Sequence, residues 1–316
     1  MSDKKVAVVA FGGNAMTRSG EDGHQEEQFL HAAEACELMI KFIKRGYELL
    51  VVHGNGPQVG NLLIQMEEAA LKVPPFTLDA CVAMTQGSMG YMLENSLVNA
   101  LARHGIEKDV VTISSEVLVD RNDPMMKQPT KPIGPFFSHY RAKQLMAEHD
   151  WQMIEDSGRG WRKVVFSPKP IKILAVGSIS KMVENGAVVI AGGGGGIPVY
   201  EATNGQFVGV EAVIDKDHTA SLLARSVKAD LFVILTEVDI VYYDYGTTKP
   251  EPLSKITVAQ AKQYLQEGQF PPGSMGPKIV ASIDFVEGGG KEVLITSAEV
   301  LEEALDGKTG TRIVRK

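Results

Sequence analysis

The chain has 316 residues, of which 44% are hydrophobic and 22% are charged, and its formal net charge at pH 7 is −7. This composition is typical of a folded globular protein and excludes an intrinsically disordered one. The acidic balance argues against nucleic acid or an anionic membrane as a general partner.

The N-terminal region begins with a strand–helix–strand pattern. Residues 6–11 form a continuous apolar run, which is typical of a strand buried on both faces. Residues 26–45 have helical apolar spacing, and Gly46 follows them as a C′ glycine would. Residues 48–52 form the next strand. A unit of this kind predicts that its two strands are parallel and adjacent.

The same alternation continues to the C-terminus. Pro57 favours a helix start, so we predict a helix at residues 58–71. The remaining predicted strands are 110–113, 163–166, 188–191, 231–235 and 292–296, and the remaining predicted helices are 178–184, 217–227, 258–267, 277–286 and 299–305. This order predicts an α/β fold, a three-layer αβα sandwich with a mostly parallel open sheet, as one domain over residues 1–316.

Residues 121–168 interrupt this pattern. The segment is rich in proline, contains both tryptophans, Trp151 and Trp161, and has no clear buried strand before residue 163. A segment this long is usually a functional loop or a small subdomain. Arg159 and Arg162 lie beside Trp161, where they either clamp an anion or serve the packing and surface of the segment itself.

The cysteines and the apolar runs of the sequence indicate in which compartment the protein works and whether it crosses a membrane. Cys36 and Cys81 are the only cysteines, and both lie in apolar stretches with helical character. They are too few for a disulfide framework and fit a reducing compartment. The first apolar run lacks the ending of a signal peptide, and no run approaches the roughly 20 apolar residues of a membrane span. We therefore expect a cytoplasmic protein without membrane contact.

Three predicted strands end in glycine-rich loops, one of which contains five consecutive glycines at 192–196. The carboxyl ends of parallel strands share the edge of a sheet at which ligands bind. Glycine either gives tight strand exits with positive φ or lets backbone N–H groups approach an oxyanion. Three such loops together favour an anion site. The candidate phosphate-binding residues are Gly12, Gly13, Asn14, Gly54, Asn55, Gly56, Gly194 and Gly195.

Three lysines have unusual sequence neighbours. Lys216 lies between Asp215 and Asp217 at a predicted helix start, Lys278 lies at another, and Lys131 is held between two prolines. Lysine near a helix N-terminus is unfavourable unless an anion is present. The alternatives are solvated surface lysines and a simple capping role for Asp215.

The sequence lacks the usual motifs for a metal site, a serine nucleophile, a dinucleotide site and a P-loop. The histidines show no HExxH spacing, and only His53, at a strand end beside a glycine loop, is of interest. A nucleophile elbow is absent, the first turn does not read GxGxxG, and Glu302 occupies the position where a P-loop needs glycine. Glycine loops with isolated lysines fit phosphoryl transfer, which depends mainly on positioning and charge neutralisation.

The sequence closely resembles carbamate kinases of the amino acid kinase superfamily. The resemblance covers nearly the whole chain, in order, and rests on GGNA, HGNGPQVGNL, DACVAMTQGSMGYML, PTKPIGPF, EDSGRGWRKVVFSPKP, GGGGGIPV, GVEAVIDKD, VILTEVD and PPGSMGPKI. It implies reversible phosphoryl transfer between ATP and carbamate, giving ADP and carbamoyl phosphate and usually run toward ATP. It also implies Mg²⁺ held chiefly by the nucleotide phosphates, a homodimer, and a protruding subdomain at 121–168.

The resemblance also assigns roles to residues. Lys216 and Lys278 would flank the transferring phosphoryl group, Asp217 would orient both lysines, and Lys131 would reach in from the protruding subdomain. Segments 1–120 and 169–220 would form the carbamoyl-phosphate side, and 221–316 the nucleotide side. Candidate nucleotide-binding residues are Thr236, Tyr245 and Met275.

Two other functions remain open at this point. One is a kinase of the same fold that acts on another small carboxylate, against which the PTKPIGP segment argues. The other is a non-catalytic sensor of nucleotide or carbamoyl phosphate, which would be expected to lack one of the three lysines. Among departures from the family pattern, Glu237 stands where glycine is frequent and could change nucleotide affinity.

Overall fold

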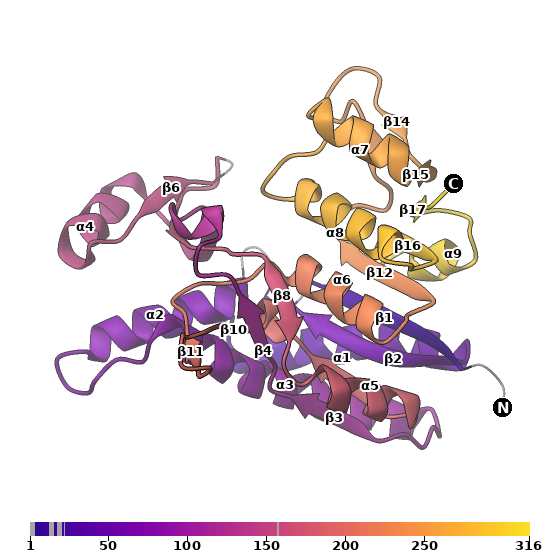
Figure 1. Cartoon of the computed structure of the whole chain (residues 1–316), viewed down its shortest axis with the longest axis horizontal. Coiled ribbons are helices and arrows are strands. Elements are labelled where there is room, and N and C mark those ends of the chain that lie inside the picture. Colours follow the sequence, from indigo (N-terminus) through magenta and orange to yellow (C-terminus); the bar gives the residue numbers. More distant parts are fainter. Residues whose placement is uncertain (1–3, 13–15, 18–20, 22, 157) are drawn as a thin grey trace.

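The computed structural model describes residues 4–12, 16–17, 21, 23–156 and 158–316. Its centre is an eight-stranded sheet in the order β15-β17-β16-β12-β1-β2-β9-β3 (Figure 1). All neighbouring pairs are parallel except β16 and β17. The strands are β1 (Lys5–Phe11), β2 (Tyr47–His53), β3 (Val110–Ile113), β9 (Val188–Ala191), β12 (Leu231–Thr236), β15 (Lys255–Thr257), β16 (Glu292–Ser297) and β17 (Thr311–Val314).

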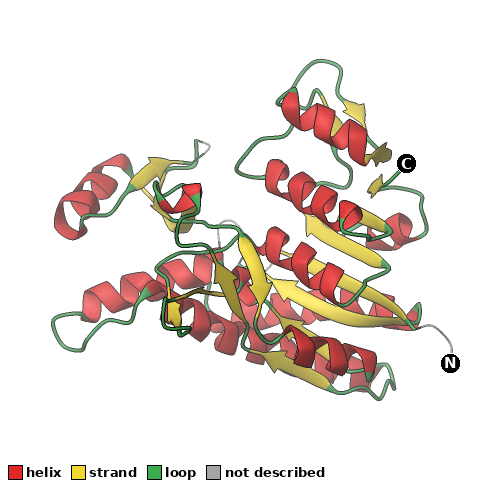
Figure 2. Cartoon of the chain, in the orientation of Figure 1, coloured by secondary structure: helices red, strands yellow, loops and turns green. Residues whose placement is uncertain are grey.

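Helices cover both faces of this sheet, which confirms the predicted sandwich (Figure 2). Helices α1 (Gln25–Lys44), α3 (Leu78–Arg103) and α9 (Leu301–Leu305) pack on one face. Helices α5 (Val176–Glu184), α6 (Lys216–Ser226) and α8 (Met275–Glu287) pack on the other, with α7 (Val258–Gln266) against α8. Cys36 in α1 and Cys81 in α3 are buried, as their apolar surroundings predicted.

The N-terminal βαβ unit forms as predicted, because β1 and β2 are parallel neighbours in register from Lys5 to Phe11. Helix α1 stops where Gly46 adopts a φ of 81°, a left-handed conformation that glycine adopts readily. Phe11 is level with both His53 of β2 and Leu235 of β12. The loops that follow these strands therefore leave the sheet at one common edge.

A second, four-stranded sheet in the order β11-β10-β4-β8 was not predicted. Its strands have three to five residues and are partly exposed, so they lack the long apolar runs that marked the main sheet. They are β4 (Glu116–Val119), β8 (Pro170–Ile173), β10 (Ile197–Glu201) and β11 (Phe207–Gly209), and a separate short hairpin pairs β13 (Tyr242–Tyr243) with β14 (Glu251–Pro252).

Within residues 121–168, a short 3₁₀ turn (Pro124–Met126) precedes a three-stranded sheet and one helix, which stand away from the main body at the left of Figure 1. The elements are β5 (Lys131–Phe137), α4 (His139–His149), β6 (Met153–Glu155) and β7 (Trp161–Val165). Ala142, Leu145, Trp151 and Met153 form a small core here. The sequence showed no clear buried strand before residue 163. The structure has the partly buried strand β5 there, which accommodates two prolines as an edge strand with an irregular register.

Candidate active site

A buried carboxylate joins two of the predicted lysines. Helix α6 begins at Lys216, and Asp217 in its first turn is only 2% exposed. Lys216 Nζ lies 2.6 Å from Asp217 Oδ1, and Lys278 Nζ, from α8, lies 2.9 Å from Asp217 Oδ2. The structure therefore brings together Lys216 and Lys278, which lie on different helices far apart in the sequence, each on its own oxygen of one carboxylate.

The third lysine contacts the neighbouring aspartate. Lys131 begins β5, and its Nζ lies 2.5 Å from Asp215 Oδ2. The other oxygen of Asp215 accepts the backbone N–H of Asp217 at 2.9 Å, so Asp215 is also the N-cap of α6. The capping role considered from the sequence is correct, and the ion pair with Lys131 is an additional role that sequence reasoning missed. The Asp-Lys-Asp sequence was the available signal.

The charges in this group stabilise one another. Burial alone would raise the pKa of Asp217, but Lys216 and Lys278 outweigh it, and the pKa lies below its usual value. Burial likewise opposes ionisation of Asp215, whose pKa is held well below its usual value by Lys131 and Lys216. Three ammonium groups and two carboxylates leave these five side chains with one net positive charge. Such a group favours an anionic ligand.

The two lysines on Asp217 differ in their surroundings. Burial lowers the pKa of Lys216, and repulsion by Lys278 adds to this effect. Burial also disfavours charged Lys278, but attraction by Asp217 outweighs it and raises the pKa of Lys278. Glu237 contributes to that rise, which places its charge within electrostatic reach of Lys278.

The glycine run is a buried turn with restricted neighbours. Gly192, Gly194 and Gly195 have φ values of 66°, 67° and 94°. The N–H of Gly195 donates to the carbonyl of Gly192 at 3.0 Å, and Thr219 Oγ1 of α6 donates to the carbonyl of Gly195 at 2.7 Å. The run is therefore tied directly to the helix that carries Lys216. The tight strand exit considered from the sequence is present, whatever the run binds.

Side chains at the second glycine loop occupy the space that side chains on the five-glycine run would need. A Cβ added to Gly193 would lie 2.3 Å from His53 Nε2, and one added to Gly194 would lie 2.2 Å from Asn55 Nδ2. Asn55 is fixed in turn, because its Nδ2 donates to Thr85 Oγ1 at 2.8 Å. Consecutive glycines thus allow two loops to interlock.

His53 is 1% exposed, and burial lowers its pKa, with a partial offset from its backbone contact. Its Nδ1 lies 3.0 Å from the carbonyl oxygen of Gly54. A carbonyl can only accept, so Nδ1 carries a hydrogen. Burial favours the neutral ring, in which Nε2, the nitrogen that faces the glycine run, carries none.

The remaining predicted phosphate-binding residues lie in the first two loops. Gly12 follows β1, whereas Gly13 and Asn14 lie outside the described residues. The N–H of Gly54 donates to the carbonyl of Phe11 at 2.9 Å, so the first two loops meet directly. Gly56 begins helix α2 (Gly56–Ala69).

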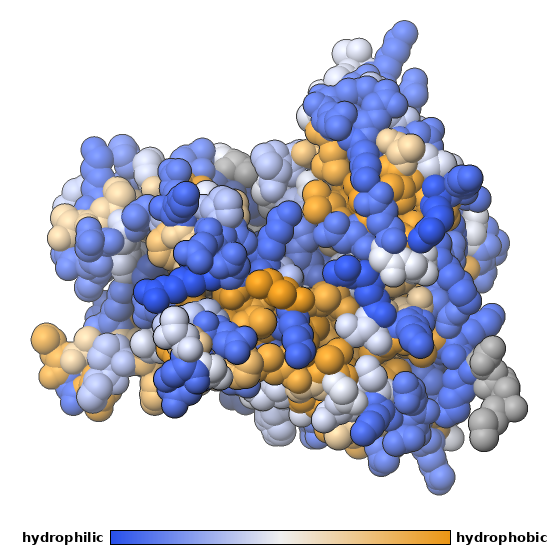
Figure 3. Space-filling view, in the orientation of Figure 1, coloured by the Kyte–Doolittle hydropathy of each residue, from blue (hydrophilic) through white to orange (hydrophobic). Residues whose placement is uncertain are grey.

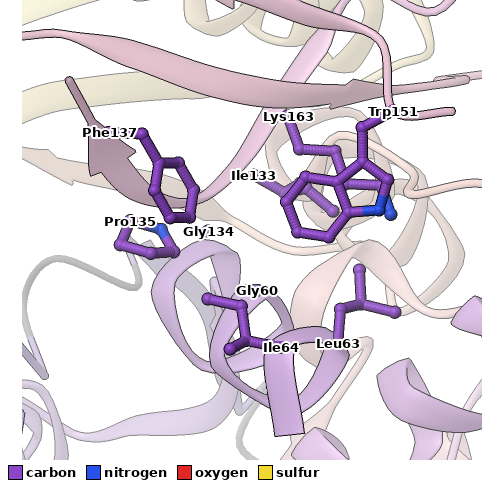
Figure 4. A pocket seen from close by; sticks show the side chains of 9 residues that line it. All are labelled: Gly60, Leu63, Ile64, Ile133, Gly134, Pro135, Phe137, Trp151 and Lys163. Atoms are coloured by element: carbon purple, nitrogen blue, oxygen red, sulfur yellow. The ribbon is translucent and has the colours of Figure 1, made fainter. Parts of the chain in front are cut away.

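Helix α2 holds the strand that carries Lys131. A Cβ on Gly60 of α2 would lie 1.8 Å from the Cα of Gly134 in β5, so the two backbones touch. Figure 4 shows a small pocket beside this contact, between α2 and the ring of Trp151. Trp151 Nε1 donates to Glu67 of α2 at 2.5 Å, which links the protruding segment to the same helix.

The predicted nucleotide residues lie on different elements. Thr236 ends β12 at the edge of the sheet described above, and Met275 begins α8, one turn before Lys278. Tyr245 follows β13, is 69% exposed, and has its ring 6.3 Å from that of Tyr242.

The basic residues around Trp161 have partners within their own segment. Arg162 Nη1 lies 3.2 Å from Asp156, its Nε donates to the carbonyl of Gly134 at 2.9 Å, and Arg159 also contacts Asp156. These contacts favour the packing alternative over an anion clamp.

Over the described ranges, no group of three or more histidine, cysteine or acidic side chains is arranged to hold a metal ion. No helix in the part of the chain with assigned structure is long and apolar enough to cross a membrane.

A three-layer sandwich with paired lysines at the carboxyl edge of its parallel strands suits the transfer of a phosphoryl group. The family model described as the amino acid kinase family matches residues 5–297, and the chain belongs to that family. Within it, the chain is similar to the carbamate kinase of Pyrococcus furiosus, with 46% identity over 98% of this chain and 99% of that one. Carbamate kinase 2 of Enterococcus faecalis is 45% identical, with 98% of each chain covered.

Comparison with solved structures gives the same family. A carbamate kinase from Giardia lamblia bound to citric acid matches with a TM-score of 0.94, 39% identity and 99% coverage of both chains. The same enzyme bound to AMP-PNP matches with a TM-score of 0.90 over the same shares. The family and fold expected from the sequence motifs are confirmed.

Proposed function

We propose that the protein is a carbamate kinase that transfers a phosphoryl group reversibly between ATP and carbamate and works mainly toward ATP. The observation that carries this proposal is the pair Lys216 and Lys278, held on the two oxygens of buried Asp217. The full-length similarity to carbamate kinases selects the substrate.

The chemistry asked of these residues is positioning and charge neutralisation. In phosphoryl transfer, charge is spread over the oxygens of the moving group, and fixed cations stabilise it. Asp217 holds the two ammonium groups at set positions, so little reorganisation is needed when the transition state forms. Lys131 adds a third cation from β5. The lysines themselves form no covalent intermediate.

We assign the two substrates to the two parts of the chain named from the sequence. Segments 1–120 and 169–220, with Lys131 from 121–168, take carbamoyl phosphate through the glycine loops. Segment 221–316 takes the nucleotide, with Thr236, Tyr245 and Met275 as contact candidates. In this arrangement Lys216 and Lys278 stand at the boundary, where the phosphoryl group passes between the substrates.

Magnesium fits this site as a companion of the nucleotide. The two carboxylates of the lysine group, Asp215 and Asp217, are each paired with lysine. We therefore assign Mg²⁺ to the phosphate oxygens and water, which suits its preference for keeping several waters. It would supply further charge neutralisation there.

We also propose a cytoplasmic homodimer. The two buried free thiols suit a reducing compartment. Exposed apolar side chains occur in the α2–α3 loop, at Leu71 and Phe76, and on α3, at Tyr91 and Val98. Figure 3 shows hydrophobic residues at the surface on the lower left, where Figure 1 shows this loop. We assign the contact between the two subunits to one of these surfaces. Light scattering should give a mass about twice the chain's 34.2 kDa, and a monomer at working concentration would contradict the dimer.

The function is tested by mixing ADP, Mg²⁺ and carbamoyl phosphate with the purified protein and measuring ATP. We expect enzyme-dependent ATP formation. ATP formation from a different acyl phosphate but not from carbamoyl phosphate would instead indicate a kinase for another small carboxylate. Binding of both ligands without turnover would indicate a sensor.

A further inference from the structure

Gln58 spans the gap between two segments at the carboxyl edge of the sheet. It lies in the first turn of α2, directly after the second glycine loop. Its Nε2 donates to Thr17 Oγ1 at 3.1 Å and to Gln28 Oε1 at 3.2 Å. Thr17 belongs to the connection after β1, and Gln28 belongs to α1. Both hydrogens of the side-chain amide are therefore used.

The carbonyl oxygen of the same amide has no hydrogen-bond partner among the residues that the structure describes. Gln58 Oε1 is buried without a hydrogen bond, which is uncommon because an unmet buried acceptor is costly. The other two such atoms among the described residues are the hydroxyls of Thr112 and Ser221. A hydroxyl can rotate to find a partner, whereas the oxygen of Gln58 is fixed by the two bonds of its own nitrogen.

The side chain of Gln58 lies among residues of the segment assigned to carbamoyl phosphate. Its amide nitrogen contacts Thr17 and Gln28, and Asn55 of the second glycine loop lies three positions before it in the chain. Two residues further along α2, Gly60 touches Gly134 of the strand that begins with Lys131. Gln58 therefore lies on a helix that contacts β5, the strand that carries Lys131, and its side chain contacts the connection after β1.

The amino group of the proposed substrate is a suitable donor for Gln58 Oε1. Lysines and backbone amides are donors, so they suit phosphate and carboxylate oxygens but not an amino group. The amino group of carbamate or carbamoyl phosphate has two N–H donors and needs an acceptor. We propose that Gln58 Oε1 accepts a hydrogen bond from this amino group and so selects the carbamoyl group over acyl groups that lack N–H. This inference rests on the proposed function.

The test compares carbamoyl phosphate with acetyl phosphate, in which a methyl group replaces the amino group. For each protein, kcat/KM for ATP formation from carbamoyl phosphate and the inhibition constant of acetyl phosphate are measured. Gln58→Met keeps the side-chain length and removes the acceptor. Gln28→Met is the matched control, because it makes the same change beside Gln58 and keeps both Oε1 and the bond from Nε2 to Thr17 that orients it.

We expect Gln58→Met to lower kcat/KM for carbamoyl phosphate by about tenfold, the size of one neutral hydrogen bond. Its inhibition constant for acetyl phosphate should stay within about twofold of wild type, and Gln28→Met should keep the wild-type ratio of the two measurements. Equal weakening of both ligands in Gln58→Met, or no change in either, would overturn the inference. A wild-type protein that makes no ATP would instead contradict the proposed function.

A second variant guards against misfolding of the first. Gln58→Glu keeps an acceptor oxygen, and its charge should weaken both anionic ligands alike. The ratio of the two measurements should therefore stay near the wild-type ratio. If Gln58→Glu unfolds at the normal temperature but changes this ratio as much as Gln58→Met does, the result would count against the inference.

Discussion

At the scale of single residues, the central feature is that each acidic group at the site is matched to lysines from distant segments. Asp217 could be suspected from its position beside Lys216. Its contact with Lys278 could not be obtained from local pattern, because 61 positions separate the two residues. Only the resemblance to a known family suggested that these residues act together. Their contact is now observed, and their catalytic roles stay predictions.

Lys131 is expected to serve one substrate more than the other. It reaches the site from β5, on the side assigned to carbamoyl phosphate. Lys131→Ala should therefore weaken use of carbamoyl phosphate more than binding of ADP, as measured by steady-state KM and titration calorimetry. Lys127→Ala, at an exposed position of the same segment, is the control and should change neither. A larger effect of Lys131→Ala on ADP binding would show that the side assignment is reversed.

His53 predicts a dependence of stability on pH. Burial lowers its pKa in the folded protein below the ordinary value of 6.5. Below about pH 6.5 the unfolded chain therefore binds a proton that the folded chain does not, and stability falls as the pH falls. The slope contributed by one group is at most about 1.4 kcal/mol per pH unit.

The measurement is the free energy of unfolding by urea between pH 7.5 and 5. His53→Asn retains a donor near the carbonyl of Gly54 and cannot titrate, so its stability should fall less steeply over this range. Identical slopes for the two proteins would show that His53 is protonated in the folded state or is accessible to solvent.

At the scale of elements, most strands of the main sheet were predictable from apolar runs of four or more residues. Most of the short strands outside that sheet, and the 26-residue helix α3, were not predicted. The run at 188–191 matches β9 at both ends because all four residues are buried. Strand β4, with only four residues and one face partly exposed, gives no comparable signal. Strand β5 was missed because its prolines argue against a strand, although an edge position tolerates them.

The glycine run gives a prediction at this scale. Gly194→Ala forces a side chain into a φ of 67° and against Asn55. We expect a loss of about 2–4 kcal/mol of unfolding free energy and a marked fall in kcat/KM. Gly205→Ala is the matched control, since Gly205 has a φ of 80° but no atoms within 4 Å of its added Cβ. It should lose about 1–2 kcal/mol and keep its activity.

The two variants separate the backbone strain of a positive φ, which both share, from the contact with Asn55, which only Gly194→Ala makes. If Gly194→Ala were no worse than Gly205→Ala in both measurements, the interlocking of the two loops would be unimportant to the site.

At the scale of the whole molecule, the order of strands and helices was sufficient to predict the sandwich, because parallel strands joined by helices have few ways to pack. It was also sufficient to place the glycine loops on one edge. The protruding segment and the second sheet depend on contacts between distant short strands, such as β4 with β8 and β10. Those contacts leave little trace in local sequence.

The account depends on cations fixed at one edge of the sheet, and its most direct test is the rate of ATP formation from carbamoyl phosphate and MgADP in Lys216→Ala and Lys278→Ala. Lys262→Ala is the control, because Lys262 also pairs with a carboxylate, Glu287, but at an exposed site. We predict that each of the first two substitutions raises the barrier by about 2–4 kcal/mol and that the control leaves it unchanged. Near-native turnover in either Lys216→Ala or Lys278→Ala would contradict the account.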